Sequence, residues 1–370
     1  MANSDGKKHR IGNVSTTDPE QAAASAGLRY VTDASPGIRR KRKGAGFVFH
    51  GPDGKRVNDR NEIRRIQALV IPPAWKNVWI CARDNGHLQA TGIDAKGRKQ
   101  YKYHPRWRSV RDEAKFDRLL AFSQKLPKIR AQVRKDLRNI DLTREKVIAT
   151  VVRLLEVSLI RIGNEEYAKE NKSFGLTTMR NRHVAVKGST VRFQFRGKGG
   201  KEHSLEVSDE RIARVVKKCQ ALPGQHLFEY RTANGEIESI GSEDVNDYLQ
   251  QIAGEPFTAK DFRTWAGTVL AAIALSKLVE FDTHALAKKN VVTAIEAVAK
   301  LLGNTPAICR KCYIHPAVAD SYLNGTLIQV LREKAENRLS RHLHRLKPEE
   351  AAVVALLRQE LAARSRKKAA

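Results

Sequence analysis

The chain has 370 residues and a mass of 41.5 kDa, which exceeds the usual size of one compact domain and favours two domains with separate cores. Lysine and arginine total 68 against 40 for aspartate and glutamate, so the formal net charge is +28 and a polyanionic partner is expected. No apolar run reaches the roughly 20 residues of a spanning helix, and the N-terminus has no apolar signal core. We therefore expect a soluble, intracellular protein. Among the partners that a basic surface could attract, which are DNA, RNA and an anionic membrane, the membrane is the least favoured.

The N-terminal part of the sequence predicts a flexible segment followed by a small domain. Residues 1–45 are rich in serine, alanine, glycine and charge, and they include the basic run at 39–43. We expect this segment to be flexible. Residues 46–110 contain short β-like runs, such as 78–81 and 87–91, separated by turn signals. This pattern predicts a β-rich N-terminal domain.

A helical connector and a larger second domain are expected next. Residues 111–140 have helical character that is interrupted at Pro127. The second domain, residues 141–345, opens with an amphipathic helix whose apolar face is expected in the core. Residues 346–370 are predicted to form a C-terminal helix and a basic tail.

Alternating apolar residues predict strands inside the second domain. Residues 183–186 and 191–195 alternate and are followed by a glycine-rich turn at 197–201, a pattern that a three-stranded antiparallel meander fits. After Ser208 almost everything has helical periodicity, including residues 209–222, 258–277 and 285–302. The predicted fold class is α+β, with a small β-rich N-terminal domain and a larger, mostly α-helical domain that contains the three-stranded antiparallel sheet.

The sequence does not predict a metal, a disulfide or a nucleotide cofactor. Of the four cysteines only Cys309 and Cys312 lie close together, and zinc would need a second pair of ligands besides the nearby His315. The glycine-rich turn around Lys198 lacks the spacing and the following helix of a Walker sequence. We therefore expect no cofactor.

Two basic residues stand where an anion would suit them. Arg161 ends an apolar run, so its charge needs either an anion or an ion pair with Glu165 or Glu156. Lys198 lies in a turn between two strands, where it is either a hairpin-tip contact to nucleic acid or an ordinary turn lysine.

Two further candidates lie in the helical part of the second domain. Thr258 and Asp261 form a helix start like a capping box, which puts Arg263 within about two turns of the helix N-terminus, where phosphate is favoured. The alternative for Arg263 is a solvated position beside the core face. Tyr313 follows Cys-Arg-Lys-Cys, whose basic residues would favour a phenolate and attract a phosphate, and the alternative is simple packing.

Taken in order, these elements resemble the catalytic domain of the type IB topoisomerases, especially the poxvirus-like enzymes also found in bacteria. Arg161 stands in Ile-Arg-Ile-Gly-Asn-Glu-Glu-Tyr, Lys198 in Phe-Arg-Gly-Lys, and Arg263 in Lys-Asp-Phe-Arg-Thr-Trp. Leu-Gly-Asn-Thr-Pro leads into Tyr313, with Asn304 where viral and eukaryotic members usually carry histidine. An amide can donate a hydrogen bond to a phosphate oxygen, but it cannot titrate or add positive charge. Asn304 would therefore have a narrower role than a histidine at the same position.

The resemblance implies a reaction and a set of roles. Tyr313 would attack one strand of double-stranded DNA to give a 3′-phosphotyrosyl ester, and religation after rotation would relax supercoils without ATP or metal. Arg161, Arg263 and Asn304 would hold the phosphate, and Lys198 would protonate the leaving 5′ oxygen.

The N-terminal domain resembles the DNA clamp of the same family. The similar stretches are Ile-Pro-Pro-Ala-Trp at 71–75 and Gly-Ile-Asp-Ala-Lys-Gly-Arg-Lys-Gln-Tyr at 92–101. The resemblance implies duplex contacts from the end of this domain, by Arg98, Lys99, Gln100, Tyr101 and Tyr103.

Two other functions stay open at this point. A tyrosine recombinase shares the nucleophile but usually places a histidine three residues before its second arginine, where this chain has Lys260. A non-enzymatic basic DNA-binding protein explains the charge but not the ordered set of residues. We expect a monomer that acts on double-stranded DNA in the cytoplasm, at the bacterial nucleoid.

Overall fold

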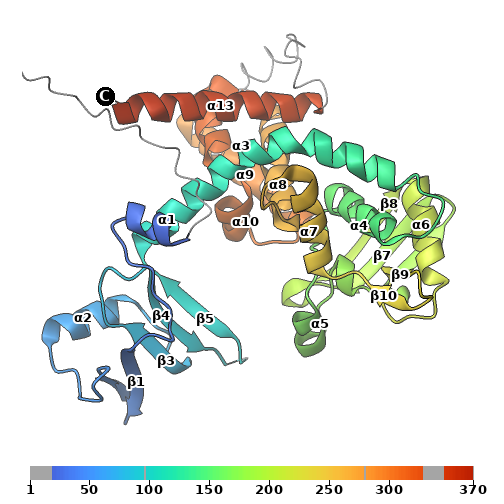
Figure 1. Ribbon diagram of the computed structural model, residues 1–370. Helices are drawn as coiled ribbons and strands as arrows, with labels where there is room; N and C mark the ends of the chain where they lie inside the picture. The colour runs from blue at the N-terminus through green and yellow to red at the C-terminus, as the bar shows by residue number, and fades with distance from the viewer. Residues whose placement is uncertain (1–18, 96, 279–280, 328–345, 370) are drawn as a thin grey trace, which may run out of the picture. The chain divides into compact units, whose positions relative to one another are not determined.

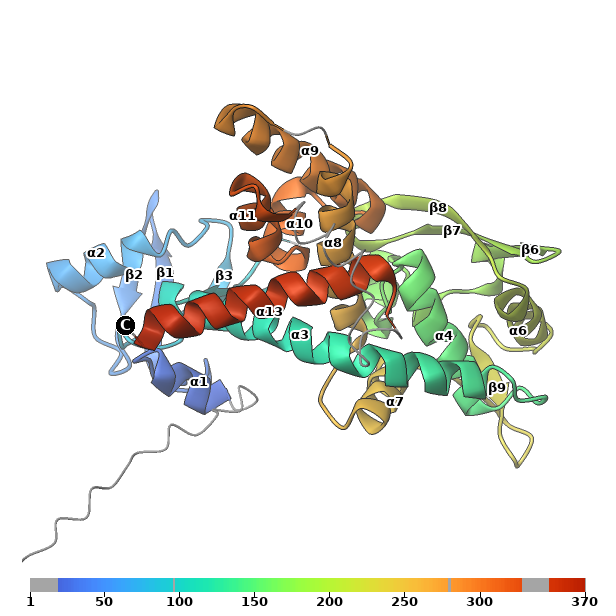
Figure 2. The ribbon, with the colours of Figure 1, turned by 90° about the horizontal axis from the view of Figure 1, so that it is seen from above.

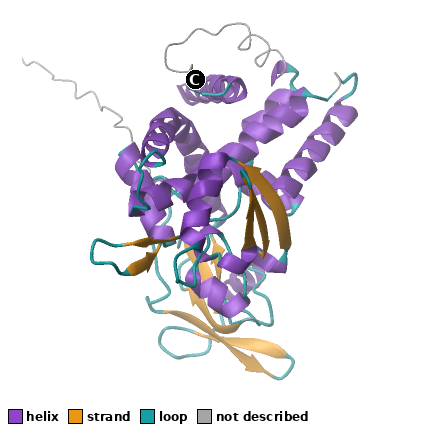
Figure 3. Cartoon of the chain, turned by 90° about the vertical axis from the view of Figure 1, so that its right-hand side faces the viewer, coloured by secondary structure: helices purple, strands orange, loops and turns teal. Residues whose placement is uncertain are grey.

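The structure is a computed structural model that describes residues 19–95, 97–278, 281–327 and 346–369, drawn as a ribbon in Figure 1. The chain divides into two compact units, Met1–Asp117 and Arg118–Ala370. Each unit contains five of the described strands, whereas most of the described helices lie in the second unit. Figure 3 colours the chain by secondary structure. The predicted α+β fold class is confirmed.

The first unit is built on a five-stranded antiparallel sheet of order β2-β1-β3-β4-β5. Its strands and its two short helices are β1 (Gly37–Lys43), β2 (Gly46–His50), β3 (Lys76–Cys81), β4 (Leu88–Ile93), β5 (Lys99–Tyr103), α1 (Pro19–Ser25) and α2 (Arg60–Ala68). On one face, Ile66 of α2 packs into a cluster with Ile38, Val78, Ile80 and Ala90. Burial of this apolar face fixes the register of the strands.

The basic run at 39–43 lies inside β1, which corrects the expectation of a flexible segment for this stretch. The strand is paired on both sides, with β2 and with β3. Arg40 donates hydrogen bonds to the carbonyls of Pro72 and Trp75, at 3.1 and 2.6 Å, and lies 4.2 Å above the ring centroid of Phe47. The density of charge suggested a flexible segment, but strand pairing satisfies the backbone hydrogen bonds whatever charge the side chains carry. Residues 1–18 lie outside the described residues.

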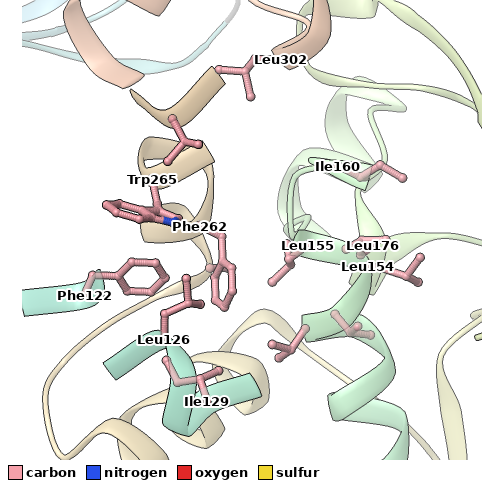
Figure 4. Packing of buried hydrophobic residues seen from close by; sticks show 14 of the residues in the cluster. Phe122, Leu126, Ile129, Leu154, Leu155, Ile160, Leu176, Phe262, Trp265 and Leu302 are labelled. Carbon is pink, nitrogen blue, oxygen red and sulfur yellow. The ribbon is translucent and has the colours of Figure 1, made fainter. Parts of the chain in front are cut away.

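Helix α3 (Pro105–Asp136) begins in the first unit and continues into the second. It runs through Pro127, so the predicted interruption there is wrong. A proline inside a helix costs about 3 kcal/mol, because it removes a hydrogen bond and crowds the preceding turn. Its neighbours Leu126 and Ile129 are fully buried, and each contributes about 1.5–3 kcal/mol in return. Figure 4 shows both side chains beside Phe122, facing Phe262.

The second unit contains the predicted three-stranded antiparallel meander, with the order β6-β7-β8. Its strands are β6 (Val184–Lys187), β7 (Thr190–Arg196) and β8 (Glu202–Ser208). Helix α6 (Glu210–Gln220) lies along this sheet, as Figure 2 shows. The inward residues Val191, Phe193 and Phe195 alternate with exposed ones along β7.

The remaining elements of the second unit are mostly helices. They are α4 (Arg144–Ser158), α5 (Glu165–Asn171), α7 (Ser242–Ala253), α8 (Ala259–Ser276), α9 (His284–Leu302), α10 (Pro306–Tyr313), α11 (Pro316–Leu323) and α13 (Pro348–Ala369), with 3-10 turns at Leu176–Thr178, Asn181–His183 and Lys198–Gly200. The sequence missed a small hairpin, β9 (Glu229–Arg231) and β10 (Ile237–Ser239). These strands have three residues each, too few for a period of two to stand out.

Helix α8 lies at the centre of this core. Phe262 and Trp265 on its buried face are each 3% exposed and pack with residues of α3 and α4 (Figure 4). The indole of Trp265 donates a 3.0 Å hydrogen bond to Glu350 of α13, and Arg130 of α3 binds the same carboxylate at 2.7 Å. These buried contacts hold α8 in place. No single helix of the described ranges has the length and apolar composition of a membrane span, although α9 and α10 meet that test together across their 90° bend.

Candidate active site

Arg161 lies just beyond α4, on a loop that is hydrogen-bonded to a second segment of chain around Gly175 and Leu176. The helix ends at Leu159, which adopts a left-handed conformation with φ 57°. The Leu176 amide donates a 2.9 Å hydrogen bond to the Arg161 carbonyl. A Cβ placed on Gly175 would lie 2.6 Å from that same carbonyl oxygen, so only glycine allows the two segments to approach this closely.

The ion pairs considered for Arg161 are not present among the described residues. Glu156 instead binds Arg130 at 2.6 Å. Glu165 lies 3.6 Å from Nδ1 of His226. Arg161 is therefore left for another partner, and it donates from Nη2 to the Asn304 side-chain oxygen at 2.5 Å.

Asn304 occupies the sharp bend between α9 and α10. Gly303 ends α9 in a left-handed conformation with φ 61°, and the Thr305 hydroxyl accepts a 3.3 Å hydrogen bond from the Ile308 amide to begin α10. While its side-chain oxygen accepts from Arg161, the Asn304 Nδ2 atom is buried and has no hydrogen-bond partner among the described residues. An unused buried donor of this kind suits an anionic ligand.

Arg263 is the most deeply buried of the predicted site residues, with 4% of its surface exposed. It donates to the carbonyl of Leu159, and from Nη2 to that of Leu302 at 2.6 Å, whereas its Nε has no partner among the described residues. Burial, and then the neighbouring Arg161 guanidinium, lower the pKa of Arg263, and the nearby Tyr313 acts in the opposite direction. The solvated position considered for Arg263 is wrong, because the helix turns this residue inward.

Tyr313 is the last residue of α10 and packs against α8. Its ring centroid lies 5.2 Å from the guanidinium carbon of Arg263. The Thr268 hydroxyl donates to the Tyr313 carbonyl at 3.3 Å. At Gly267 a Cβ would lie 2.5 Å from that carbonyl oxygen, so the close approach of the tyrosine to α8 requires glycine. Tyr313 and Arg263 are thus held by the same helix.

Lys198 lies at the turn between β7 and β8, as predicted, and is exposed. The turn is closed by the Gly197 amide, which donates to the Lys201 carbonyl at 2.7 Å. Gly199 and Gly200 follow with positive φ values of 77° and 76°. Such a turn can present the lysine at a tip while its strands stay anchored in the sheet.

Three of these cations line one small cavity of about 30 Å³, room for about one water molecule. They are Arg161, Lys198 and Arg263, and none of the described residues that line the cavity is acidic. Neither arginine forms an ion pair with a described residue, and the described ranges contain no group of three or more His, Cys, Asp or Glu side chains suited to a metal. Two guanidiniums gathered without a described counter-charge favour an anionic ligand.

One residue of this cavity was missed by the sequence argument. His203 of β8 lines it, and its ring stacks on that of Phe195, its cross-strand partner, at 5.0 Å between centroids. Burial, and then the charges of Arg161 and Arg263, lower the pKa of His203. Strand alternation after the Lys198 turn is the signal that would have placed this residue on the cavity side.

The DNA contacts predicted for the first unit lie at β5. Tyr101 and Tyr103 are stacked with centroids 6.0 Å apart, and Tyr101 is 46% exposed. Lys99 forms a 2.6 Å ion pair with Asp33, which also accepts a hydrogen bond from the Thr91 hydroxyl at 3.0 Å. These contacts fix a lysine beside two aromatic rings.

Arg98 and Gln100 are held by a different acid. The Asp94 carboxylate binds Arg98 at 2.7 Å and accepts from the Gln100 amide at 2.9 Å. Because side chains alternate along a strand, Gln100 faces away from Lys99 and Tyr101. The predicted contacts therefore divide between two faces of the sheet.

Comparison with known proteins agrees with this arrangement. The family model described as the eukaryotic DNA topoisomerase I catalytic core matches residues 104–359, and that of the bacterial DNA topoisomerase IB N-terminal domain matches residues 46–94. DNA topoisomerase 1B of Acanthamoeba polyphaga mimivirus is 31% identical over 296 residues, covering 78% of this chain and 88% of the viral protein. The chain belongs to the type IB DNA topoisomerases.

More distant relatives of this topoisomerase share less of its length. DNA topoisomerase 1B of vaccinia virus (strain Copenhagen) is 22% identical over 253 residues, covering 65% of this chain and 74% of the viral one. DNA topoisomerase 1 of Schizosaccharomyces pombe is 28% identical over 194 residues, covering 51% of this chain and 21% of the yeast one. The protein is thus an enzyme that acts on the topology of DNA, and its N-terminal domain is of the bacterial kind.

Proposed function

We propose that this topoisomerase relaxes supercoiled duplex DNA by cutting one strand with Tyr313 and resealing it, through a 3′-phosphotyrosyl intermediate and without ATP or metal. The observation that carries the proposal is the cavity lined by two arginines without acidic partners, one of which, Arg263, lies 5.2 Å from the ring centroid of Tyr313, a residue outside the cavity lining. A phosphodiester supplies the charge that these guanidiniums lack.

Arg161 and Arg263 would bind the non-bridging oxygens of the scissile phosphate. Each presents a rigid fork of donors, and the unused Nε of Arg263 and Nδ2 of Asn304 add further hydrogen bonds. These contacts strengthen as negative charge accumulates on the phosphorus oxygens, so they lower the barrier rather than only binding the substrate.

The chemical step exchanges one phosphate ester for another. The Tyr313 oxygen forms a bond to phosphorus while the bond to the 5′ oxygen breaks, and the phenol proton passes to solvent. Lys198 would give its proton to the departing 5′ oxygen, help that is typically worth about 100- to 10,000-fold. Because the two esters have similar energy, the freed 5′ hydroxyl reverses the step without ATP. The guanidiniums carry the charge-stabilising role that a metal ion has in other phosphoryl-transfer sites.

The wider setting follows from the same proposal. Lys99, Tyr101 and Tyr103 would contact the duplex from one face of the first unit, and Arg98 and Gln100 from the end of β5. We place the enzyme in the bacterial cytoplasm, at the nucleoid, as a monomer that does not depend on a membrane.

The decisive experiment is plasmid relaxation by the purified protein and by Tyr313→Phe. We expect the parent to relax positive and negative supercoils in EDTA and without nucleotide, and the variant to be inactive while it still binds DNA, because only the attacking oxygen is removed. On a suicide substrate the adduct should map to Tyr313. Dependence on ATP or metal, or an adduct on another residue, contradicts the proposal, and exchange between two specific sites without relaxation identifies a recombinase.

A further inference from the structure

The ring of His203 lies between the two turns that carry Lys198 and Asn304. A Cβ placed on Gly197, the residue before Lys198, would lie 2.7 Å from Cδ2 and Nε2 of that ring. A Cβ placed on Gly303, the residue before Asn304, would lie 2.7 Å from its Cε1. Both glycines therefore allow the backbone of their turn to lie directly against the imidazole.

The imidazole is itself held in a fixed orientation. It is stacked on Phe195 with an interplanar angle of 10°, and the two residues are paired across β7 and β8. Phe195 is 5% exposed and belongs to the main core of the second unit. Because the ring is stacked on a core residue of β7, the position of the sheet fixes the position of the ring in the cavity.

Lys198 follows the glycine that lies against this ring. Its turn is closed by hydrogen bonds from the Gly197 amide to the Lys201 carbonyl at 2.7 Å and from the Gly200 amide to the Gly197 carbonyl at 3.0 Å, so the position of Gly197 sets the position of the turn. Asn304 follows the other glycine, and its side-chain oxygen accepts a hydrogen bond from Arg161. A proton donor and a phosphate-binding group that belong to different elements act together only if something sets their spacing.

We propose that His203 is the positioning residue that sets the Lys198 turn against the Gly303–Asn304 bend, so that proton donor and phosphate-binding groups meet at one phosphate. The inference rests on the proposed function, because it assigns His203 a role through Lys198. The ring acts by shape and stacking. Burial and the charges of Arg161 and Arg263 lower the pKa of His203, which agrees with a neutral ring in this place.

The test uses DNA in which sulfur replaces the leaving 5′ oxygen at the cleavage site. A thiolate departs without a proton, so cleavage of this substrate does not need the general acid. We expect His203→Ala to slow single-turnover cleavage of ordinary DNA by about 10- to 100-fold, the effect of a misplaced catalytic group. On the sulfur substrate the same variant should cleave within about threefold of the parent, since protonation no longer limits the rate. His203→Phe, which keeps a ring on Phe195, should retain most activity on both substrates.

Two controls separate the possible failures. Lys198→Ala should be rescued by sulfur, and Arg263→Ala should not, because the phosphate oxygens still need their charge partner. If sulfur fails to rescue Lys198→Ala, the general acid of the proposed function is wrong. If it rescues Lys198→Ala but not His203→Ala, or if His203→Ala cleaves ordinary DNA at the parental rate, only the role of His203 is wrong. Equal melting temperatures of His203→Ala and the parent exclude a folding defect, and the Phe variant decides the point if the temperatures differ.

Discussion

The cavity lined by Arg161 and Arg263 and the surface formed by Arg98 and Lys99 at β5 both present cations, but the charges are partnered differently. In the cavity Arg161 and Arg263 lie together, and none of the described lining residues is acidic. At β5, Lys99 and Arg98 are each bound to an aspartate, at 2.6 and 2.7 Å. The first arrangement is costly until a phosphate arrives and favours chemistry, whereas the second fixes side chains at little cost and favours recognition.

The largest effect that tests this contrast is expected at Arg263. Arg263→Lys keeps a positive charge but loses the fork of donors that binds two carbonyls and, in the proposed reaction, would bind phosphate oxygens. We expect single-turnover cleavage to fall by about 100- to 1,000-fold, the usual cost of a lost transition-state donor. Arg98→Ala, measured at saturating protein as the matched control, should stay near the parental rate. Similar losses in both variants would erase the distinction between the two regions.

A smaller effect is expected from releasing a cation at β5. Asp33→Asn frees Lys99 from its ion pair, so binding to non-specific duplex DNA should tighten by up to about fivefold, with a dependence on salt steeper by about one ion. Cleavage at saturating protein should not change. Glu210→Gln, which also raises the net charge by one and breaks the exposed pair with Arg214, is the control. An equal gain in both variants would mean that only net charge matters.

The smallest effect concerns acid stability of the second unit. Burial and neighbouring arginines lower the pKa of His203 and of His183 in the folded protein. The unfolded chain, in which histidine titrates near pH 6.5, then binds more protons, so stability falls as the pH drops through about 6.5. We expect the melting temperature to decrease between pH 7.5 and pH 5.5. His203→Phe should show a weaker dependence, and an unchanged slope would contradict a neutral, half-buried ring.

The broad fold could be predicted because its signals are periodic. The strands of the meander alternate, and the helical period of α8 placed Phe262 and Trp265 in the core. That the basic run at 39–43 forms the strand β1 could not be predicted, because a strand that carries five basic residues has the composition of a solvated segment. Nor could the continuity of α3 through Pro127, since tertiary burial overrode a local preference.

The candidate site shows the same division between motif and geometry. Its residues were identified through resemblance to a family, because one tyrosine or arginine alone has no specific pattern. Their distances, the burial of Arg263 and the contact of His203 with two turns arise from segments far apart in the chain. Such contacts leave no local trace beyond the glycines that permit them.

Helix α8 carries Arg263 and, one turn later, the glycine against which Tyr313 rests. In the proposed reaction, one helix would therefore fix the backbone of Tyr313 relative to the guanidinium that binds the phosphate oxygens. While the cut duplex rotates and strains the protein, both residues would move together with this helix. The phosphotyrosyl bond would then stay within reach of the groups that reseal the strand.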